Sequence, residues 1–131
     1  MKTIYLCGGI NKLSDAEAMD WREAAKKELA GLYNFLDPMR RDYRGKEAES
    51  VFQIIAGDME DIRQAHILLV NAARPSWGTG MEVYAGYSPP FSRQVITVCP
   101  DDRPSPWLIG HSHKILKSFP EAFVFLREIA A

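Results

Sequence analysis

The chain has 131 residues, of which 47% are hydrophobic and 25% are charged. A chain of this length fits one compact domain, which buries roughly two thirds of the surface of the unfolded chain. Its 16 basic and 17 acidic residues give a formal net charge of -1, and this balance excludes the strong overall field that draws proteins to nucleic acid polymers or anionic lipids. We therefore expect a single domain over residues 1–131 and a small-molecule partner.

The start of the chain carries one lysine and a short apolar run that Gly8 and Gly9 interrupt. This run is too short for the core of a signal peptide, and no stretch of the sequence is long enough to span a membrane. Cys7 and Cys99 end apolar runs without the spacing of metal ligands, which indicates reduced, buried thiols rather than a disulfide. We expect a cytoplasmic protein that uses no metal or other cofactor.

Five short β-rich runs alternate with helical patterns along the chain. This alternation predicts βαβ units and a parallel sheet. Because crossovers between parallel strands are right-handed, we expect a flavodoxin-like α/β fold, in which a doubly wound five-stranded parallel sheet is the middle of three α/β/α layers. The predicted strands are Thr3 to Cys7, Tyr33 to Asp37, His66 to Asn71, Gln94 to Cys99 and Lys114 to Lys117.

The first and last predicted helices carry clear start signals. Ser14 and Glu17 have the spacing of a capping box, and Gly31 ends the first helix. Ser118 precedes the last helix, with Glu121 three residues later as the returning carboxylate. The apolar positions that we expect to be buried are Ala18, Trp21, Ala25 and Leu29 in the first helix and Ala122, Phe123, Leu126 and Ile129 in the last.

One carboxylate, Glu82, follows a glycine-rich turn after the third strand. Gly78 and Gly80 in this turn allow backbone N–H groups to approach a ligand, and the helix that begins here favours negative charge in its first turn. Glu82 therefore either complements the helix dipole or acts as a catalyst. In a doubly wound fold this connection lies at the carboxyl ends of the strands, where ligands bind.

A second carboxylate, Asp58, falls on a helical face marked by Val51, Ile55 and Ile62. A continuous helix places its charge among apolar side chains unless another group pairs with it, which is typical of function. Alternatively, the glycine before it breaks the helix and Asp58 caps the second piece. Asp61, at the edge of the same face, is either exposed to solvent or supports Asp58.

Two carboxylates in a cleft shielded from water are the groups needed to cleave a glycosidic bond. One attacks the anomeric carbon, and the other handles the proton of the leaving group. Glu82, ionised by nearby N–H donors, is the predicted nucleophile. Asp58 is the predicted acid, because apolar neighbours raise the pKa of a carboxyl group.

Three segments of the chain share a family pattern: Tyr5 to Ile10, Asp58-x-x-Asp61-Ile62-x-x-Ala65, and Gly78-Thr79-Gly80-Met81-Glu82 with Ala85 beyond it. Together they resemble the nucleoside 2-deoxyribosyltransferase superfamily, which includes the 2'-deoxynucleoside 5'-phosphate N-hydrolases. The resemblance implies that Glu82 attacks C1' of the deoxyribose and forms a glycosyl-enzyme intermediate. It also implies that Asp58 assists at the base.

The resemblance also bears on the 5' end of the substrate. Six residues before the nucleophile, the transferases typically have an aspartate and the monophosphate hydrolases a serine, and here the residue is Ser76. A hydroxyl and N–H groups donate to a phosphate that a carboxylate repels; the alternative is an ordinary turn residue. In the hydrolases a serine of the neighbouring subunit completes this site. Ser105 either matches that serine, which implies a homodimer or higher oligomer, or caps the short segment after it.

Three arginines follow the second strand, within five positions. Arg40, Arg41 and Arg44 either hold a phosphate bidentately or belong to a lid or a solvated charged segment. Asp37, at the end of the strand, either bonds the base or sugar or forms an Asx turn before a proline. Two further residues, His111 and His113, lack a third metal ligand and favour an interface or surface role.

These observations predict an enzyme that breaks the N-glycosidic bond of 2'-deoxyribonucleosides or their 5'-monophosphates by retaining double displacement. Gly8, Gly9 and the turn formed by Ser76, Gly78 and Gly80 are expected to hold the sugar and its 5' group. Ser76 favours water as the acceptor. The alternatives are transfer to a second nucleobase and a nucleotide-binding sensor without turnover, and the base preference stays open.

Overall fold

Five parallel strands form one sheet in the order β2-β1-β3-β4-β5. The computed structural model describes all residues from 1 to 131. This order is the flavodoxin-like one, and it confirms the fold predicted from the alternating pattern. The strands are β1 (Thr3–Gly8), β2 (Asn34–Leu36), β3 (Ile67–Asn71), β4 (Gln94–Val98) and β5 (Lys114–Leu116), each within two residues of its predicted ends.

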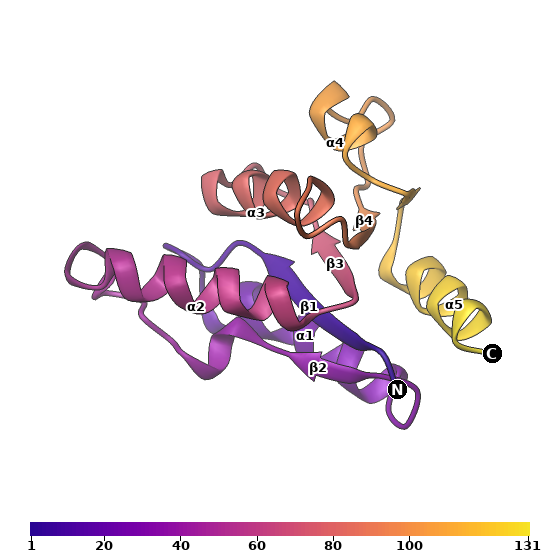
Figure 1. Ribbon diagram of the computed structural model, residues 1–131, viewed down its shortest axis with the longest axis horizontal. Helices are drawn as coiled ribbons and strands as arrows, with labels where there is room; N and C mark the ends of the chain where they lie inside the picture. The colour runs from indigo at the N-terminus through magenta and orange to yellow at the C-terminus, as the bar shows by residue number, and fades with distance from the viewer.

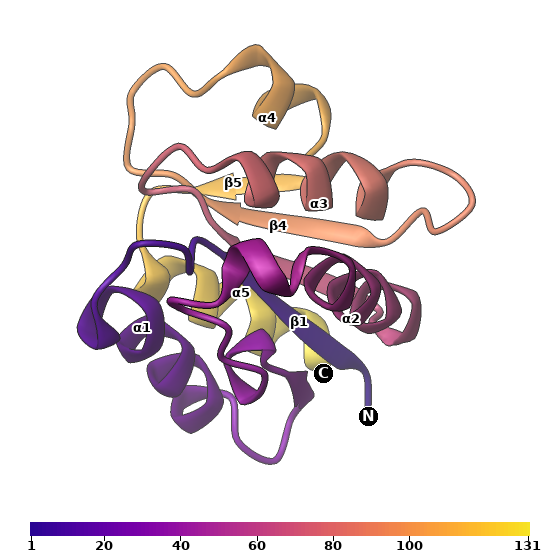
Figure 2. The same cartoon turned by 90° about the vertical axis from the view of Figure 1, so that its left-hand side faces the viewer.

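Helices cover both faces of the sheet (Figure 1). In Figure 2, α2 and α3 lie in front of the strands and α5 lies behind them. None of these helices combines the length and apolar character needed to cross a membrane. The helices are α1 (Asp15–Glu28), α2 (Val51–Gln64), α3 (Trp77–Tyr87), α4 (Pro106–Gly110) and α5 (Phe119–Ala130), with two short 3-10 helices, η1 (Pro38–Arg40) and η2 (Glu47–Glu49).

The sheet separates two hydrophobic cores, because successive side chains of each strand point to opposite faces. On β1, Ile4 and Leu6 join the core under α1 and α5, whereas Tyr5 and Cys7 join the core under α2 and α3. All four side chains are buried, as expected for a parallel strand covered on both sides. Tyr5 and Cys7 thereby face the helix that carries Glu82.

The caps predicted from the sequence are present. Ser14 and Glu17 form a reciprocal capping box at the start of α1, and Gly31 follows that helix with a φ of +79°. The side chain of Ser118 accepts a hydrogen bond from the backbone N–H of Glu121 at the start of α5. The predicted apolar stripes are buried except at their far end, where Ile129 is 38% exposed in the last turn of α5.

The glycine-rich segment before Glu82 is not a turn, as the sequence suggested, but the first turn of α3. Ser76 is the N-cap of this helix, and its side chain accepts from the N–H of Thr79 at 3.4 Å. The N–H of Gly80 donates to the carbonyl of Ser76 at 3.0 Å. Glu82 consequently lies in the second turn, beyond the N–H groups that a first-turn carboxylate accepts from.

Helix α2 also differs from expectation. It runs without a break through Gly57, so the alternative in which Asp58 caps a second helix is wrong. Of the apolar residues predicted to bury Asp58, only Ile62 lies in the core, whereas Val51 and Ile55 are 47% and 55% exposed. The N-terminal half of α2 lines an open pocket instead of packing on the sheet.

Candidate active site

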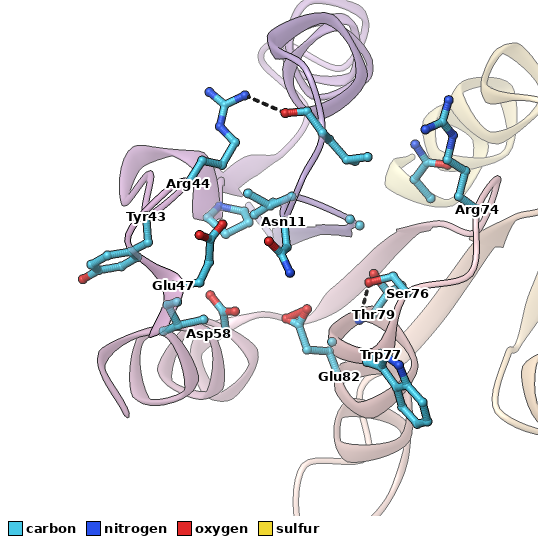
Figure 3. Close-up of a pocket in the computed structure, with 18 of the residues that line it drawn as sticks. Asn11, Tyr43, Arg44, Glu47, Asp58, Arg74, Ser76, Trp77, Thr79 and Glu82 are labelled. Carbon is cyan, nitrogen blue, oxygen red and sulfur yellow. Dashed lines mark hydrogen bonds between the residues drawn. The ribbon is translucent and has the colours of Figure 1, made fainter. Parts of the chain in front are cut away.

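A cavity of about 670 Å³ opens at the carboxyl ends of β1 and β3, where the strand order reverses. Its walls come from the loop after β1, the segment between β2 and α2, the first two turns of α2, and the segment from β3 into α3. Figure 3 shows side chains from these segments converging on one space. Both the volume and the position are those of a small-molecule site in a doubly wound fold.

Glu82 reaches this pocket from α3 and is held by side chains of β1. The Tyr5 hydroxyl donates to its Oε2 at 2.5 Å, and the Cys7 thiol lies 3.8 Å from its Oε1. Side chains, rather than backbone N–H groups, are therefore its hydrogen-bond donors. Since Ser76 caps the helix and Glu82 lies beyond its first turn, the alternative in which Glu82 only complements the helix dipole is wrong.

The pKa of Glu82 is raised to about 8. Burial is the main cause, and the negative charge of Asp58 adds to it, while the hydrogen bond from Tyr5 opposes it. We had expected N–H donors at the helix start to keep this carboxylate ionised, and this expectation fails because the side chain lies past the first turn. Much of the Glu82 carboxyl population is protonated at neutral pH in the free protein.

Asp58 projects from α2 into the same pocket, and Figure 3 shows its carboxyl group facing that of Glu82 across the cavity. Burial raises the pKa of Asp58, as predicted, although the guanidinium of Arg41 opposes the shift. The two acidic side chains of the family pattern thus share one solvent-restricted space. Their proton affinities are linked, because the charge of Asp58 raises the pKa of Glu82.

Asp61 lies one turn after Asp58 and is buried, not exposed to solvent. Arg40 binds it with two nitrogens, Nη1 at 3.0 Å and Nη2 at 2.6 Å. Arg41 Nη2 donates to Oδ2 of Asp61 at 2.7 Å and to Oδ1 of Asp58 at 3.2 Å. Asp61 therefore supports Asp58 through a shared arginine, which was one of the two roles expected for it.

The arginine segment folds against the pocket rather than extending into solvent. Arg41 and Arg44 line the cavity, whereas Arg40 lies behind Asp61 and does not. Arg44 binds carboxylates of Asp42 and Asp15, each at 2.7 Å. The guanidinium groups that we considered for phosphate binding thus have carboxylate partners in this structure.

Among the glycines proposed for the sugar site, Gly8, Gly9 and Gly78 line the pocket and Gly80 does not. A Cβ at Gly8 would lie 2.7 Å from Cζ2 of Trp21, so the absence of a side chain at this position allows close packing against α1. Open space surrounds the Cβ positions of Gly78 and Gly80. Ser76 lines the pocket as well as capping α3.

Asp37 and Ser105 lie outside the cavity of a single chain. Asp37 accepts from the backbone N–H of Met39 at 2.8 Å, which is the Asx arrangement considered above, and its other oxygen binds Lys26 at 2.6 Å. Ser105 caps α4 by accepting from the N–H of Trp107 at 3.2 Å.

The structure adds pocket residues that the sequence reasoning did not single out. Asn11 lies in the loop after β1 and Asn71 is the last residue of β3, and their position at the carboxyl ends of these strands was the available signal. Arg74 lies near Ser76 and forms an ion pair with Glu17. Tyr43 and Glu47 extend into the pocket from the segment between β2 and α2. Nothing in the sequence around Tyr43 and Glu47 indicated that these two residues line the pocket.

The two histidines near β5 serve structural contacts. The backbone N–H of Val95 donates to Nδ1 of His113 at 2.9 Å. His111 stacks on Trp107 with ring centroids 5.7 Å apart and also contacts Tyr84. The structure contains no group of three or more His, Cys, Asp or Glu side chains placed to hold a metal ion.

Comparisons with known proteins identify the family of this chain. The family model for nucleoside 2-deoxyribosyltransferase matches residues 4–118. The chain belongs to this family. A solved structure of a 2-deoxyribosyltransferase from the psychrotolerant bacterium Bacillus psychrosaccharolyticus is similar in fold, with a TM-score of 0.70 and 18% sequence identity over 95% of each chain. A search of curated proteins found no significant match.

Membership of the nucleoside 2-deoxyribosyltransferase family supports an enzyme that acts on small-molecule deoxynucleosides. The reaction class is nucleoside deoxyribosyl transfer or a related N-glycosidase activity. The match begins in β1 and ends just before α5, so it includes both pocket carboxylates.

Proposed function

We propose that this protein cleaves the N-glycosidic bond of 2'-deoxynucleoside 5'-monophosphates by retaining double displacement, with Glu82 as nucleophile and Asp58 as acid and base. The observation that carries the proposal is the convergence of these two carboxyl groups on one pocket, one from α3 and one from α2. Two carboxyl groups in these roles are the equipment of retaining glycosidases.

In the first step, Glu82 attacks C1' of the deoxyribose, and the bond from C1' to the base nitrogen breaks. The electron pair leaves with the base, which takes the proton of Asp58. In the second step, the Asp58 carboxylate removes a proton from water, and the resulting hydroxide attacks C1' and releases Glu82. The productive state therefore carries its shared proton on Asp58, with Glu82 ionised and oriented by Tyr5.

The start of α3 suits a 5' phosphate. The hydroxyl of Ser76 faces the pocket, and the N–H groups of Trp77 and Gly78 have no hydrogen-bond partner. Free N–H groups at a helix start, together with the helix dipole, attract anions. Arg74 lies beside Ser76, bound only to the surface carboxylate of Glu17, and supplies a positive charge that can be redirected to a phosphate.

The alternative acceptor is a second nucleobase, and the family name favours it. To separate the two reactions, the protein is incubated with each deoxynucleoside and its monophosphate, with and without a second free base. Chromatography of the products then distinguishes them: free base released without an acceptor indicates hydrolysis, and exchange only with an acceptor indicates transfer. No product from any substrate, combined with tight binding that Glu82→Ala leaves unchanged, contradicts both reactions and indicates a sensor.

The active unit is proposed to be a homodimer in which α3 and α4 meet a second copy. Trp77, Met81 and Tyr84 follow one another at helical spacing on the outer side of α3 and are exposed. Trp107 of α4 is 71% exposed, and His111 connects it to Tyr84. A continuous exposed apolar surface of this kind is typical of an interface. Ser105 is the N-cap of α4, so this contact is the proposed means of bringing Ser105 to a neighbouring pocket.

A further inference from the structure

Gly57 lies in the middle of α2, where glycine is an unfavourable helix residue. The space beside it is occupied by the side chain of Arg41. A Cβ at Gly57 would lie 2.6 Å from Nε and 3.0 Å from Cζ of Arg41. Any other residue at position 57 displaces the guanidinium from the helix, so the glycine makes room for this arginine.

The docked guanidinium connects two carboxylates of α2. Its Nη2 lies 2.7 Å from Asp61 and 3.2 Å from Asp58. Asp61 is buried and is also bound by Arg40. Asp61 therefore anchors the guanidinium of Arg41 on the side away from the pocket. Arg41 is the single hydrogen-bond donor to Asp58 in the structure. The family pattern accounts for the two aspartates but not for the arginine between them.

We propose that Arg41, docked on Gly57 and anchored by Asp61, is a positioning residue that fixes the direction of the Asp58 carboxyl group in the pocket. The role of Arg41 rests on the proposed function only for the part of the test that measures enzyme kinetics. The contact itself does not depend on which acceptor or which 5' group the enzyme uses.

The charged groups around Asp58 determine in which direction the loss of Arg41 shifts its pKa. Burial and the charge of Asp61 raise the pKa of Asp58, and Arg41 is the first of the groups that lower it. Without Arg41 the pKa of Asp58 rises further. The ionisable groups that face Asp58 are Arg41 after η1, Asp61 on α2, Arg22 on α1, Glu82 on α3, Tyr5 and Cys7 on β1, and Glu47 of η2 across the pocket.

Glu82 responds in the opposite direction. Because the charge of Asp58 raises the pKa of Glu82, protonating Asp58 lowers it. Removing Arg41 therefore raises the proton affinity of one carboxyl group and lowers that of the other. A general loosening of the pocket admits water around both groups and shifts both pKa values down, towards the values of exposed carboxyls. Opposite shifts are therefore the signature of the proposed role.

The experiment titrates both carboxyl groups by carbon-13 NMR in protein labelled at the Asp and Glu side-chain carboxyls. Arg41→Gln removes the charge, and Gly57→Ala displaces the same guanidinium while favouring the helix. In both variants we expect the pKa of Asp58 to rise and the pKa of Glu82 to fall. The melting temperature of Gly57→Ala should not decrease, since alanine is the better helix residue.

Two further variants test whether the contact between Arg41 and Gly57 causes the pKa shifts. In the double variant Arg41→Gln with Gly57→Ala, the shift should equal that of Arg41→Gln alone, because both changes act on one contact. Arg63→Gln removes an arginine from the same helix, where it binds only Glu60 on the surface, and should leave both titrations unchanged. With an active substrate, the acidic limb of the kcat/KM profile should move up with the pKa of Asp58, because Asp58 is already ionised where Glu82 titrates.

Unchanged titration of Asp58 in Arg41→Gln overturns the proposal, and so do additive shifts in the double variant or parallel downward shifts of both carboxyls. The NMR titration needs no turnover. A protein that proves inactive on every deoxynucleoside therefore contradicts the proposed function while the role of Arg41 is still tested. An active enzyme with unaltered Asp58 titration contradicts the role of Arg41 and leaves the proposed function intact.

Discussion

The hydroxyl of Tyr5 donates a 2.5 Å hydrogen bond to Oε2 of Glu82, which connects the middle of β1 to the second turn of α3 at the floor of the pocket. The two residues are 77 positions apart in the sequence. This bond lowers the pKa of Glu82 against the larger effect of burial. It therefore favours the ionised nucleophile while fixing its direction.

Replacing Tyr5 with phenylalanine should raise the pKa of Glu82, lower the plateau of the kcat/KM profile and move its basic limb to higher pH. Each unit of this shift lowers the ionised fraction near neutral pH by about tenfold. The lost hydrogen bond should also reduce the free energy of unfolding by about 1 kcal/mol. The measurements are the pH profile of turnover and denaturant unfolding of both proteins.

Tyr33→Phe is the matched control for this change. The hydroxyl of Tyr33 is also buried and donates to the carbonyl of Leu126 at 2.6 Å, on the opposite face of the sheet. Its removal should cost similar stability and leave the pH profile as it is. If Tyr5→Phe behaves like this control, the hydroxyl of Tyr5 has no part in setting the ionisation of Glu82.

The raised pKa of Glu82 also makes stability depend on pH. Its pKa is about 8 in the folded protein and near its ordinary value of 4.5 in the unfolded chain. Between these values the folded state binds more protons than the unfolded state, so the free energy of unfolding falls as the pH rises. The slope contributed by this one group is at most about 1.4 kcal/mol per pH unit.

Glu82→Gln should remove this slope. The variant should be more stable than the natural protein at pH 8, and the difference should shrink towards pH 4.5, while turnover is lost because the amide cannot attack C1'. Denaturant unfolding at several pH values gives the comparison. Glu49→Gln changes an exposed glutamate whose side chain makes no hydrogen bond, and this variant should follow the natural protein throughout. Equal slopes in all three proteins contradict the assignment of a raised pKa to Glu82.

Ser76 offers a test of the phosphate site that leaves the helix intact. Ser76→Asp keeps a good N-cap, so the stability of α3 should be preserved. The new carboxylate repels a phosphate dianion, and kcat/KM for the monophosphate should fall by about tenfold or more, whereas kcat/KM for the free nucleoside should not. The ratio of the two constants is the measured quantity.

Ser118→Asp is the control, because Ser118 caps α5 in the same way and lies away from the pocket. It should leave both constants unchanged. An equal loss for nucleoside and monophosphate in Ser76→Asp indicates that Ser76 acts only as the cap of α3, and hydrolysis of the monophosphate then loses its main support.

The fold was predictable because its signals are local. Strand β1 is covered on both faces and therefore appears as an uninterrupted apolar run, and the caps at Ser14 and Ser118 need only residues three positions away. The five strands and the outer helices follow from such patterns. The two pocket carboxylates were also accessible to sequence reasoning, because the rule that ligands bind beyond the carboxyl ends of strands selects the segment that contains Glu82.

The errors arose where a tertiary contact decides the local structure. Glycines at 78 and 80 suggested a turn, yet the cap at Ser76 and the packing of Val83 and Gly86 on the sheet make the segment helical. A Cβ at Gly86 would lie 2.5 Å from Leu68, so close approach of α3 to β3 requires glycine there. Propensity alone does not report such packing.

The same reason explains the wrong prediction for the ionisation of Glu82. The donors to Glu82 come from β1, and the donor to Asp58 comes from a segment 17 residues earlier in the chain. The apolar stripe of α2 was taken for a core face, but its first turns extend past the sheet and line the cavity. Periodicity identifies an apolar face without saying whether protein or a ligand covers it.

The exposed surface of α3 and α4 leads to the last prediction. Met81→Glu and Trp107→Glu each place a charge on this surface, and each should convert a dimer into monomers in sedimentation analysis, because a buried unpaired charge is costly at an interface. Lys114→Glu is the control, since Lys114 is an exposed residue at the edge strand β5, away from this surface. A natural protein that sediments as a monomer contradicts the proposed interface.

Sharing of the site between subunits has a sharper test. If Ser105 serves the neighbouring pocket, Ser105→Ala and Glu82→Gln homodimers should each be impaired on the monophosphate. Mixing them with subunit exchange should restore activity, because one pocket of each mixed dimer then combines an intact Glu82 with the partner's intact serine. Mixing Glu82→Gln with Ser76→Ala should give no such recovery, since both residues belong to the pocket of their own chain. Equal outcomes for the two mixtures indicate that Ser105 only caps α4, and the pocket is then complete within one subunit.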